Sequence, residues 1–236
     1  MQKSVKLQDG LMKDNLAYNI FFTLKVSTKA LIKNFLDNAE KLLKDYYRDK
    51  KFNIRTEESV CQIRHRFSSG GINGGNFVYM PTSYYILKEI MDYLKLNKDD
   101  IFVDLGCGKG RAMFVASMQG VKKVIGVEIE EGLVKSANEN AGNFRFNKSA
   151  LFILHKDVID LDLSEGTVFF MFNPFGEDLF SKVIENIKAS LKINPRGIRI
   201  VYYVPVYREI LNRQDWLVPD GNLLNNRVLV WRNVKN

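Results

Sequence analysis

The stretch FVDLGCGKGRA, residues Phe102 to Ala112, decides the fold, because it places three glycines within five positions directly after an apolar run. The apolar run predicts a strand, and the residues after the glycines have helical spacing. In an open parallel sheet, a glycine-rich turn between a strand and a helix lets a ligand approach the backbone and the helix N-terminus. The stretch therefore predicts a ligand-binding loop at the carboxyl end of a strand.

Outward from this loop, predicted strands and helices alternate. Apolar and β-branched runs predict strands, and amphipathic spacing predicts helices. The strands are expected at 100–105, 123–129, 151–156, 167–172 and 198–204, and the helices between them at 111–120, 131–144 and 177–192. Two more apolar runs within 215–234 predict closing strands, one of them antiparallel. The prediction is an α/β fold with a Rossmann-like, doubly wound sheet of seven mostly parallel strands.

The chain before this sheet is expected to form a basic helical extension. Apolar residues recur at helical intervals from about Asn15 to Asp49. Residues 1–66 hold 14 Lys and Arg against 8 Asp and Glu, which is most of the formal net charge of +8. Such an extension could attract an acidic partner such as RNA, an acidic protein or an anionic membrane surface. A solvated helix face packed on the main domain explains the same pattern.

Spacing and composition disfavour several kinds of site. The dinucleotide fingerprint needs a glycine where this chain has Arg111, and a phosphate-binding P-loop needs Ser or Thr where it has Gly110. Two cysteines and two histidines without ligand spacing predict no metal site and no disulfide framework. We expect no transmembrane segment and a cytoplasmic protein, because there is no secretory signal and no apolar run of about 20 residues.

The spacing of the glycines points to a different cofactor. Asp-x-Gly-x-Gly-x-Gly, with Asp104, Gly106, Gly108 and Gly110, resembles motif I of the class I S-adenosylmethionine-dependent methyltransferases. The resemblance covers about residues 79–236. It implies that these four residues bind S-adenosylmethionine, together with Cys107, which we interpret as a small residue of the loop and not as a nucleophile.

Two strand-end acids extend this resemblance. It implies that Glu128 accepts hydrogen bonds from the two ribose hydroxyls of the cofactor, for which a carboxylate is suited. It also implies that Asp157 receives the adenine amino group, with Val158 supplying the neighbouring backbone amide. Either acid alone could be an ordinary solvated residue. The predicted cofactor contacts therefore depend on both acids following successive strands in the order that the family shows.

The glycine-rich stretch before the main domain is expected to act as a linker or lid. Residues 67–82 contain four glycines, at 70, 71, 74 and 75, which allow hinge motion over the cofactor. Tyr79 and Thr82 follow at the entrance of the domain, and we include both among the cofactor-binding residues. The alternative is a passive linker. The predicted division of the chain is thus 1–66, 67–82 and 83–236.

The expected catalytic residues follow the fourth strand. Asn173, Pro174 and Phe175 resemble the Asp/Asn-Pro-Pro-Tyr/Phe motif of amino-directed methyltransferases, although the second proline is missing. Asn173 and the carbonyl of Pro174 would accept hydrogen bonds from an amine, and Phe175 would cover it. An ordinary strand-ending turn is the alternative. Together with "FNIRTEESV" and "YMPTS", the motifs also look like a group of bacterial methyltransferases of unassigned substrate.

The predicted function is therefore S-adenosylmethionine-dependent methyl transfer to an amino group of a protein lysine, a nucleic acid or a small molecule. The methyl acceptor itself is not specified by the sequence. A second hypothesis is a non-catalytic cofactor-binding module that acts through its basic helical extension. A third, a nicotinamide-dependent oxidoreductase, is disfavoured by the spacing of the glycines.

Overall fold

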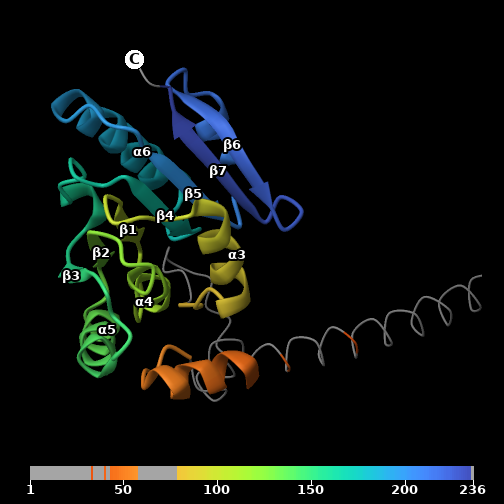
Figure 1. The fold of residues 1–236 in the computed structure, drawn as a ribbon. Helices are drawn as coiled ribbons and strands as arrows, with labels where there is room; N and C mark the ends of the chain where they lie inside the picture. Colours follow the sequence, from red (N-terminus) through yellow and green to blue (C-terminus); the bar gives the residue numbers. More distant parts are fainter. Residues whose placement is uncertain (1–32, 34–39, 41–42, 58–78, 235–236) are drawn as a thin grey trace, which may run out of the picture. The chain divides into compact units, whose positions relative to one another are not determined.

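The computed structural model describes residues 33, 40, 43–57 and 79–234 (Figure 1). The chain divides into two compact units, 1–45 and 46–236. The described residues of the first unit are helical, and in the second unit residues 46–52 are helical. This confirms the predicted helix where it is described. The other residues of the predicted helical extension and residues 58–78 lie outside the described residues, so the predicted boundary at 66/67 and most of the predicted linker or lid stay predictions.

The described part of the second unit contains a seven-stranded sheet, as predicted. Its order is β3-β2-β1-β4-β5-β7-β6. The strands are β1 Ile101–Leu105, β2 Lys123–Glu128, β3 Ala150–His155, β4 Val168–Phe172, β5 Arg199–Tyr203, β6 Leu217–Leu223 and β7 Val228–Asn233. The first five are parallel, and β7 is antiparallel to both β5 and β6. Because β1 lies between β2 and β4, the chain reverses its direction of winding beside β1, where ligands bind in open α/β sheets.

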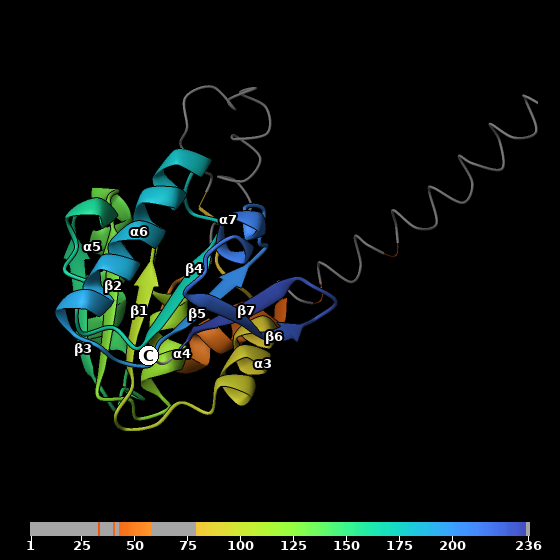
Figure 2. The ribbon, with the colours of Figure 1, turned by 90° about the horizontal axis from the view of Figure 1, so that it is seen from above.

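Helices cover both faces of this sheet (Figures 1 and 2). They are α3 Tyr84–Leu94, α4 Arg111–Ser117, α5 Glu131–Asn143, the 3-10 turn η1 Val158–Asp160, α6 Glu177–Ile193 and α7 Arg208–Asn212. Helix α3 begins after Pro81 with Ser83 as its N-cap, whose hydroxyl accepts from the amide of Ile86. An N-cap hydroxyl satisfies an amide that has no partner within the helix.

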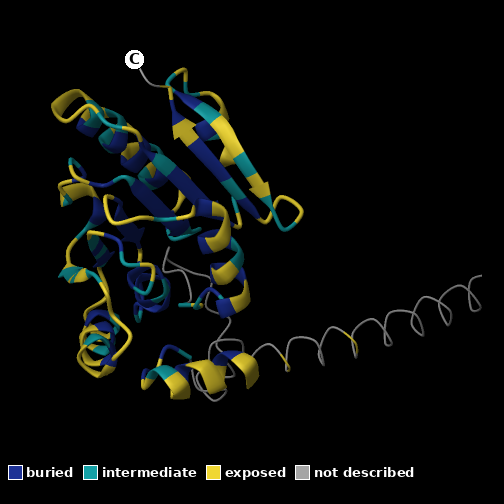
Figure 3. Ribbon diagram, viewed as in Figure 1, coloured by how far each residue is buried: buried dark blue, intermediate teal, exposed yellow. Residues whose placement is uncertain are grey.

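Two apolar clusters form the core, one on each face of the sheet. On one face, α6 and α7 pack against residues of β1, β4, β5 and β7, with Phe180, Tyr202 and Trp231 among the buried side chains. On the other face, α3 and α4 pack against alternate residues of the same strands. Figure 3 shows the buried residues concentrated in the central strands and on the inner faces of the helices. Strands buried on both faces explain the continuous apolar runs in the sequence.

The antiparallel end of the sheet is less regular. The pairing of β6 with β7 shifts register between Pro219 and Gly221, which is a β-bulge. The hydroxyl of Tyr93 in α3 donates to the carbonyl of Asp220, at 2.7 Å. A Cβ at Gly221 would lie 2.4 Å from the Tyr93 oxygen, so this close approach requires glycine.

None of the described helices is both long and apolar enough to cross a membrane. Among the described residues, no group of three or more His, Cys, Asp or Glu is arranged to hold a metal ion.

Candidate active site

The glycine loop, residues 106–110, follows β1 at the carboxyl edge of the sheet. Gly106, Gly108 and Gly110 have φ values of 85°, 53° and 88°, a region that glycine adopts at no steric cost. The amides of Gly106 and Cys107 both donate to the carbonyl of Val127 in β2, at 3.0 Å. The loop is therefore held against the neighbouring strand by its own backbone.

Two side chains from distant parts of the chain contact this loop closely. A Cβ at Gly108 would lie 2.2 Å from a ring carbon of Tyr79, and a Cβ at Gly106 would lie 2.7 Å from Cβ of Pro174. Real Cβ atoms do not approach other atoms so closely. The glycines are thus required by neighbours as well as by backbone conformation, and Pro174 of the predicted catalytic motif lies against the predicted cofactor loop.

Glu128 connects the end of β2 to the loop. Its Oε2 accepts from the amide of Gly108 at 2.9 Å, and its Oε1 accepts from the amides of Ile129 and Glu130 at 2.9 and 3.0 Å. Because three backbone hydrogen bonds fix the carboxylate, its position beside the loop is well defined. This arrangement provides an anionic acceptor where the sequence predicted one.

Asp104 and Cys107 are both buried beside Glu128. Asp104 is 3% exposed, and burial, with a smaller contribution from the charge of Glu128, raises its pKa to about 8. Burial also raises the pKa of the Cys107 thiol, and the charges of Asp104 and Glu128 add to this. A thiol that keeps its proton is a poor nucleophile, which agrees with the interpretation of Cys107 as a small residue of the loop.

Asp157 and Val158 lie after β3, two strands from the loop. The carboxylate of Asp157 accepts from the amide of Ile159 at 3.0 Å and so caps the turn η1. Val158 is 5% exposed and packs in the core cluster of the α6 face. The predicted adenine contacts of both residues stay predictions.

Tyr79 and Thr82 are described, and both lie near the glycine loop. The Tyr79 hydroxyl donates to the carbonyl of Thr56 at 2.8 Å, and burial raises its pKa well above the usual range. Thr82 is 5% exposed, and its carbonyl accepts from Arg111 at 3.3 Å. The end of the predicted lid is thus beside the loop, while residues 67–78 lie outside the described part of the chain.

Asn173 follows β4 at the same edge and is fixed by the next strand. Its Oδ1 accepts from the hydroxyl of Tyr202 in β5, at 2.9 Å. Its φ of 40° is in the left-handed region. Val204, which follows β5, has a φ of 53°. Phe172 and Tyr203 are partners in the strand register, so these two strained residues end neighbouring strands side by side. Strained backbone of this kind is concentrated at functional sites.

Phe175 lies differently from its neighbours in the motif. It is 9% exposed and belongs to the core cluster that includes α6. In this arrangement its ring contributes mainly to packing beneath the site. The predicted role of covering the acceptor therefore receives no support from its burial and stays a prediction.

Four residues of this region were not among the predicted site residues, although Thr56 and Glu57 belong to the quoted stretch "FNIRTEESV". Tyr202 fixes Asn173, and a second group, Asp49, Thr56 and Glu57, surrounds the buried Arg111. One signal could have revealed the second group. Arg111 is the first residue of α4, where the helix dipole disfavours a positive charge, so a buried arginine there requires acidic partners from elsewhere.

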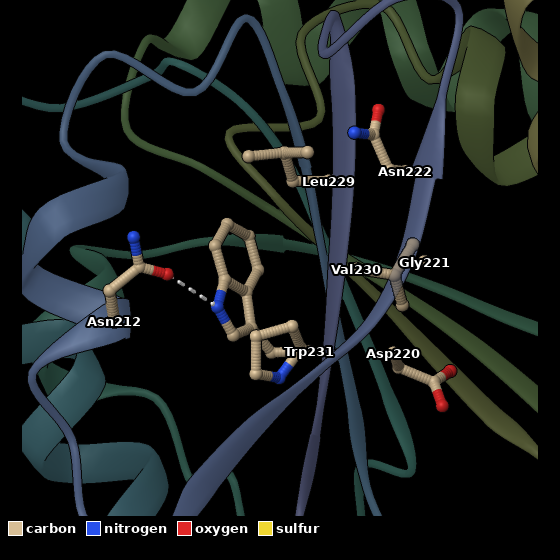
Figure 4. Close-up of a pocket in the computed structure, with 8 residues that line it drawn as sticks. Asn212, Asp220, Gly221, Asn222, Leu229, Val230 and Trp231 are labelled. Carbon is tan, nitrogen blue, oxygen red and sulfur yellow. Dashed lines mark hydrogen bonds between the residues drawn. The ribbon is translucent and has the colours of Figure 1, made fainter.

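Two hollows of the described surface lie away from this site. One, of about 310 Å³, lies between α7, β6 and β7, and Figure 4 shows the residues that line it. Trp231 is one of these residues, and its indole N–H already donates a hydrogen bond to Asn212 Oδ1, at 3.1 Å. A second, of about 210 Å³, lies at the amino ends of the strands beside Asp100, Arg199 and Arg232. Neither contains a residue of the predicted site.

Comparisons with known proteins agree on the class of enzyme. Residues 71–195 match the model of the family described as histone methylation protein DOT1. The chain is 32% identical over 148 residues to a protein-lysine N-methyltransferase of Saccharolobus islandicus. This match covers 61% of this chain and 87% of that protein. It is also 29% identical over 145 residues to a histone-lysine N-methyltransferase of Dictyostelium discoideum that is specific for H3 lysine 79. This second match covers 56% of this chain and 8% of that protein.

A solved structure supports the fold. An RNA methyltransferase of Salinibacter ruber in complex with S-adenosyl-L-homocysteine superposes with a TM-score of 0.50 at 21% identity. The match covers 66% of this chain and 94% of that one. At this level of identity the similarity concerns the Rossmann-like architecture alone.

Proposed function

The chain belongs to the family of the histone methylation protein DOT1, and from that premise we propose that it methylates the amino group of a lysine side chain in a protein. The comparisons establish that the chain is a class I S-adenosylmethionine-dependent methyltransferase, without specifying its acceptor. The observation that supports a lysine amine as the acceptor is the hydrogen bond between Tyr202 and Asn173, which fixes a carboxamide oxygen at the end of β4, next to the Pro174 that lies against Gly106.

The residues present fit S-adenosylmethionine. Positive φ values at Gly106, Gly108 and Gly110 give the loop a conformation whose backbone a ligand can approach, although Pro174 and Tyr79 occupy the Cβ positions of Gly106 and Gly108. Glu128 supplies a fixed carboxylate at the end of β2, which suits the two neighbouring hydroxyls of a ribose. When bound, S-adenosylmethionine supplies a methyl group on a positively charged sulfur, which leaves as a neutral thioether.

The main task of the protein is then to aim the acceptor amine. A carboxamide oxygen has two acceptor positions, and at Asn173 Oδ1 the Tyr202 hydroxyl uses one of them. The second position and the carbonyl of Pro174 can accept the two N–H groups of a neutral primary amine. With both N–H groups held, the direction of the nitrogen lone pair is set, and such alignment accounts for much of the rate of a displacement reaction.

The surface next to Asn173 suits the aliphatic part of a lysine side chain. The rings of Phe172 and Tyr203 lie 4.4 Å apart at the ends of β4 and β5. Val204 and Val206 are 37% and 59% exposed just beyond β5. Tyr203 is itself buried, so Val204 and Val206 are the side chains that a lysine stem would cover, with its amine nitrogen near the polar Asn173. These side chains fit a lysine stem, but aromatic rings also fit a nucleobase, so the preference for lysine is supported by the family and the protein-lysine methyltransferase relative.

Two alternatives to lysine methylation are distinguished by the experiment described below. The basic residues of 1–66 could attract a nucleic acid or an acidic protein, and the non-catalytic module would bind cofactor without turnover. The closer resemblance to bacterial methyltransferases of unassigned substrate, through the Asn-Pro-Phe motif, and the cytoplasmic location also stay predictions. None of these changes the expected chemistry at Asn173.

The acceptor can be identified by tritium transfer from labelled S-adenosylmethionine to fractionated lysate, treated in parallel with RNase or protease. We expect label that resists RNase, is lost on proteolysis and is recovered as methylated lysine after acid hydrolysis. Label that is lost on RNase treatment would make a nucleic acid the acceptor. Absence of transfer by a protein that binds S-adenosylhomocysteine normally would favour the non-catalytic module.

Asn173→Ala tests the role of the carboxamide once the acceptor is known. We expect single-turnover methyl transfer to fall about 10²-fold or more, because alignment is lost, while S-adenosylhomocysteine affinity changes less than about twofold. Lys95→Ala is the matched control, since Lys95 has a similar φ of 47° but lies at the C-terminus of α3. A wild-type rate for Asn173→Ala would reduce Asn-Pro-Phe to an ordinary turn.

A further inference from the structure

A buried arginine joins three separate parts of the chain beside the glycine loop. Arg111, the first residue of α4, is 2% exposed. Its Nε donates to the hydroxyl of Thr56 at 2.6 Å, its Nη1 to the carbonyl of Thr82 at 3.3 Å, and its Nη2 to the carboxylate of Glu57. Its guanidinium also lies over the ring of Tyr84, 4.7 Å from the centroid. One side chain thus holds both residues 56–57 and the approach to α3.

Asp49 completes this cluster from the helix over 46–52. Its carboxylate is 3.6 Å from Arg111 Nη2 and accepts from the hydroxyls of Thr56 and Tyr84, at 2.8 and 2.6 Å. It also accepts from the amides of Thr56 and Glu57. Asp49 is 3% exposed. A buried carboxylate with this many donors is satisfied only while residues 46–57 stay in place.

The same residues contact the glycine loop through bonds that do not involve Arg111. The Tyr79 hydroxyl donates to the Thr56 carbonyl, and the Tyr79 ring covers Gly108. Lys109 Nζ donates to the Glu57 carbonyl at 3.3 Å. Asn140 of α5 donates to the carbonyls of both Arg55 and Lys109, at 3.2 and 3.1 Å. Residues 55–57 are therefore joined to the loop directly through Lys109 and indirectly through Asn140 and Tyr79.

Burying the positive charge of Arg111 at the start of a helix is unfavourable unless acidic side chains compensate it. At the first position of a helix, a positive charge opposes the helix dipole, and a buried guanidinium loses its hydration. Asp49 and Glu57 compensate both effects, and neither belongs to the sheet. Within the described part of the chain, the carboxylates that balance the charge of Arg111 therefore come from residues 46–57.

We propose that Arg111 is a positioning residue that couples cofactor binding to the docking of residues 46–57. Docked residues 55–57 hold Tyr79 and the glycine loop in the arrangement that accepts the cofactor. Coupling between two equilibria is reciprocal, so cofactor binding must stabilise docking by the same factor by which docking raises cofactor affinity. The inference concerns cofactor binding alone, and it stands whether the methyl acceptor is a protein or not.

Two variants weaken the coupling to different degrees. Arg111→Met removes the charge and all of its donors, whereas Thr56→Val removes only the hydroxyl that joins Arg111 to Asp49. We expect S-adenosylhomocysteine affinity, measured by calorimetry, to fall at least tenfold in Arg111→Met and about three- to tenfold in Thr56→Val. Arg111→Lys should recover part of the loss, because it keeps the charge without the planar fork of donors.

Arg196→Met is the matched control for a merely structural arginine. Arg196 also bridges distant backbone, since it donates to the carbonyls of Gly166 and Leu163 at 2.7 and 2.6 Å, but it lies at the amino ends of the strands. Its loss is expected to lower the unfolding midpoint and to leave S-adenosylhomocysteine affinity within about twofold. If both arginine variants weaken affinity in proportion to their loss of stability, Arg111 is only structural and the proposal is overturned.

Hydrogen exchange provides a second readout. Saturating S-adenosylhomocysteine should slow amide exchange in residues 46–57 of the wild-type protein, by a factor that matches the affinity difference between wild type and Arg111→Met. In Thr56→Val, which keeps the charges and is expected to fold, this added protection should be smaller. Unchanged exchange in 46–57 of the wild-type protein on adding S-adenosylhomocysteine would overturn the coupling even if Arg111→Met fails to fold.

Discussion

Gly108→Ala tests the packing of the glycine loop most directly. With a φ of 53°, any L-residue at this position is strained, at a cost of about 1–2 kcal/mol. The new Cβ would also lie 2.2 Å from Tyr79, so the ring must leave its place. Losing the hydroxyl bond to Thr56 costs about 1 kcal/mol, and losing most of the ring's burial costs about 2 kcal/mol. The expected total is about 4–5 kcal/mol.

Gly120→Ala separates strain from collision. Gly120 has a φ of 74°, but no atom lies within 4 Å of its Cβ position, so its variant should lose only the strain, about 1–2 kcal/mol. Urea unfolding monitored by circular dichroism gives both free energies. A double variant with Tyr79→Ala removes the collision, and in it Gly108→Ala should cost no more than Gly120→Ala does in the wild-type protein.

Cofactor affinity should differ between Gly108→Ala and Gly120→Ala in the same direction as stability. We expect Gly108→Ala to weaken S-adenosylhomocysteine binding at least tenfold in calorimetry and Gly120→Ala to leave it unchanged. If Gly108→Ala destabilises the protein no more than Gly120→Ala and binds with wild-type affinity, the contact between Tyr79 and the loop is not a constraint, and the reasoning from the glycine geometry is refuted.

Three further predictions follow from buried or bonded groups. Glu128→Gln should weaken S-adenosylhomocysteine binding about tenfold in calorimetry, because an amide cannot accept on both of its terminal atoms; an unchanged affinity would contradict the assigned acceptor. Asp104 has a pKa of about 8 in the folded protein against about 4 when unfolded. The native state therefore binds the extra proton between these values, and the free energy of unfolding should fall as pH rises from 4 to 8, by up to about 1.4 kcal/mol per unit. Asp104→Asn should lack this component in urea titrations at several pH values, and a pH-independent difference between the two proteins would show that Asp104 is ionised. Phe180→Ala removes a ring that is fully buried and stacked on Tyr202 with centroids 5.0 Å apart, and should lower the free energy of unfolding by about 3–5 kcal/mol; a loss below 1 kcal/mol in urea would contradict this packing.

The alternation of strands and helices was predictable because its causes are local. Residues of β1 and β4 are buried on both faces and so form continuous apolar runs. The spacing of Gly106, Gly108 and Gly110 likewise indicates a loop whose conformation needs glycine at each of these positions.

The contacts that complete the site depend on pairings between distant residues. Tyr202 meets Asn173 only because β4 and β5 align Met171 with Tyr202 in a parallel register. Arg111 and Thr56 are 55 positions apart, and no periodicity relates them. The burial of Phe175 in the cluster that includes α6 likewise depends on packing between elements, and its predicted role as a cover for the acceptor stays a prediction. Register and packing between elements decide such contacts, and neither can be predicted from one sequence.

The bulge in β6 also bears on how the protein behaves in concentrated solution. β6 is an outer strand of the sheet, and an outer strand with free backbone groups can pair with another chain and start aggregation. Pro219 has no amide hydrogen to offer, the bulge breaks the even spacing of the remaining groups, and the Tyr93 hydroxyl occupies the carbonyl of Asp220. The exposed charges of Asp220 and Arg232, paired at 3.3 Å, add a hydrated barrier beside it. This side of the sheet is therefore protected against the addition of a further strand.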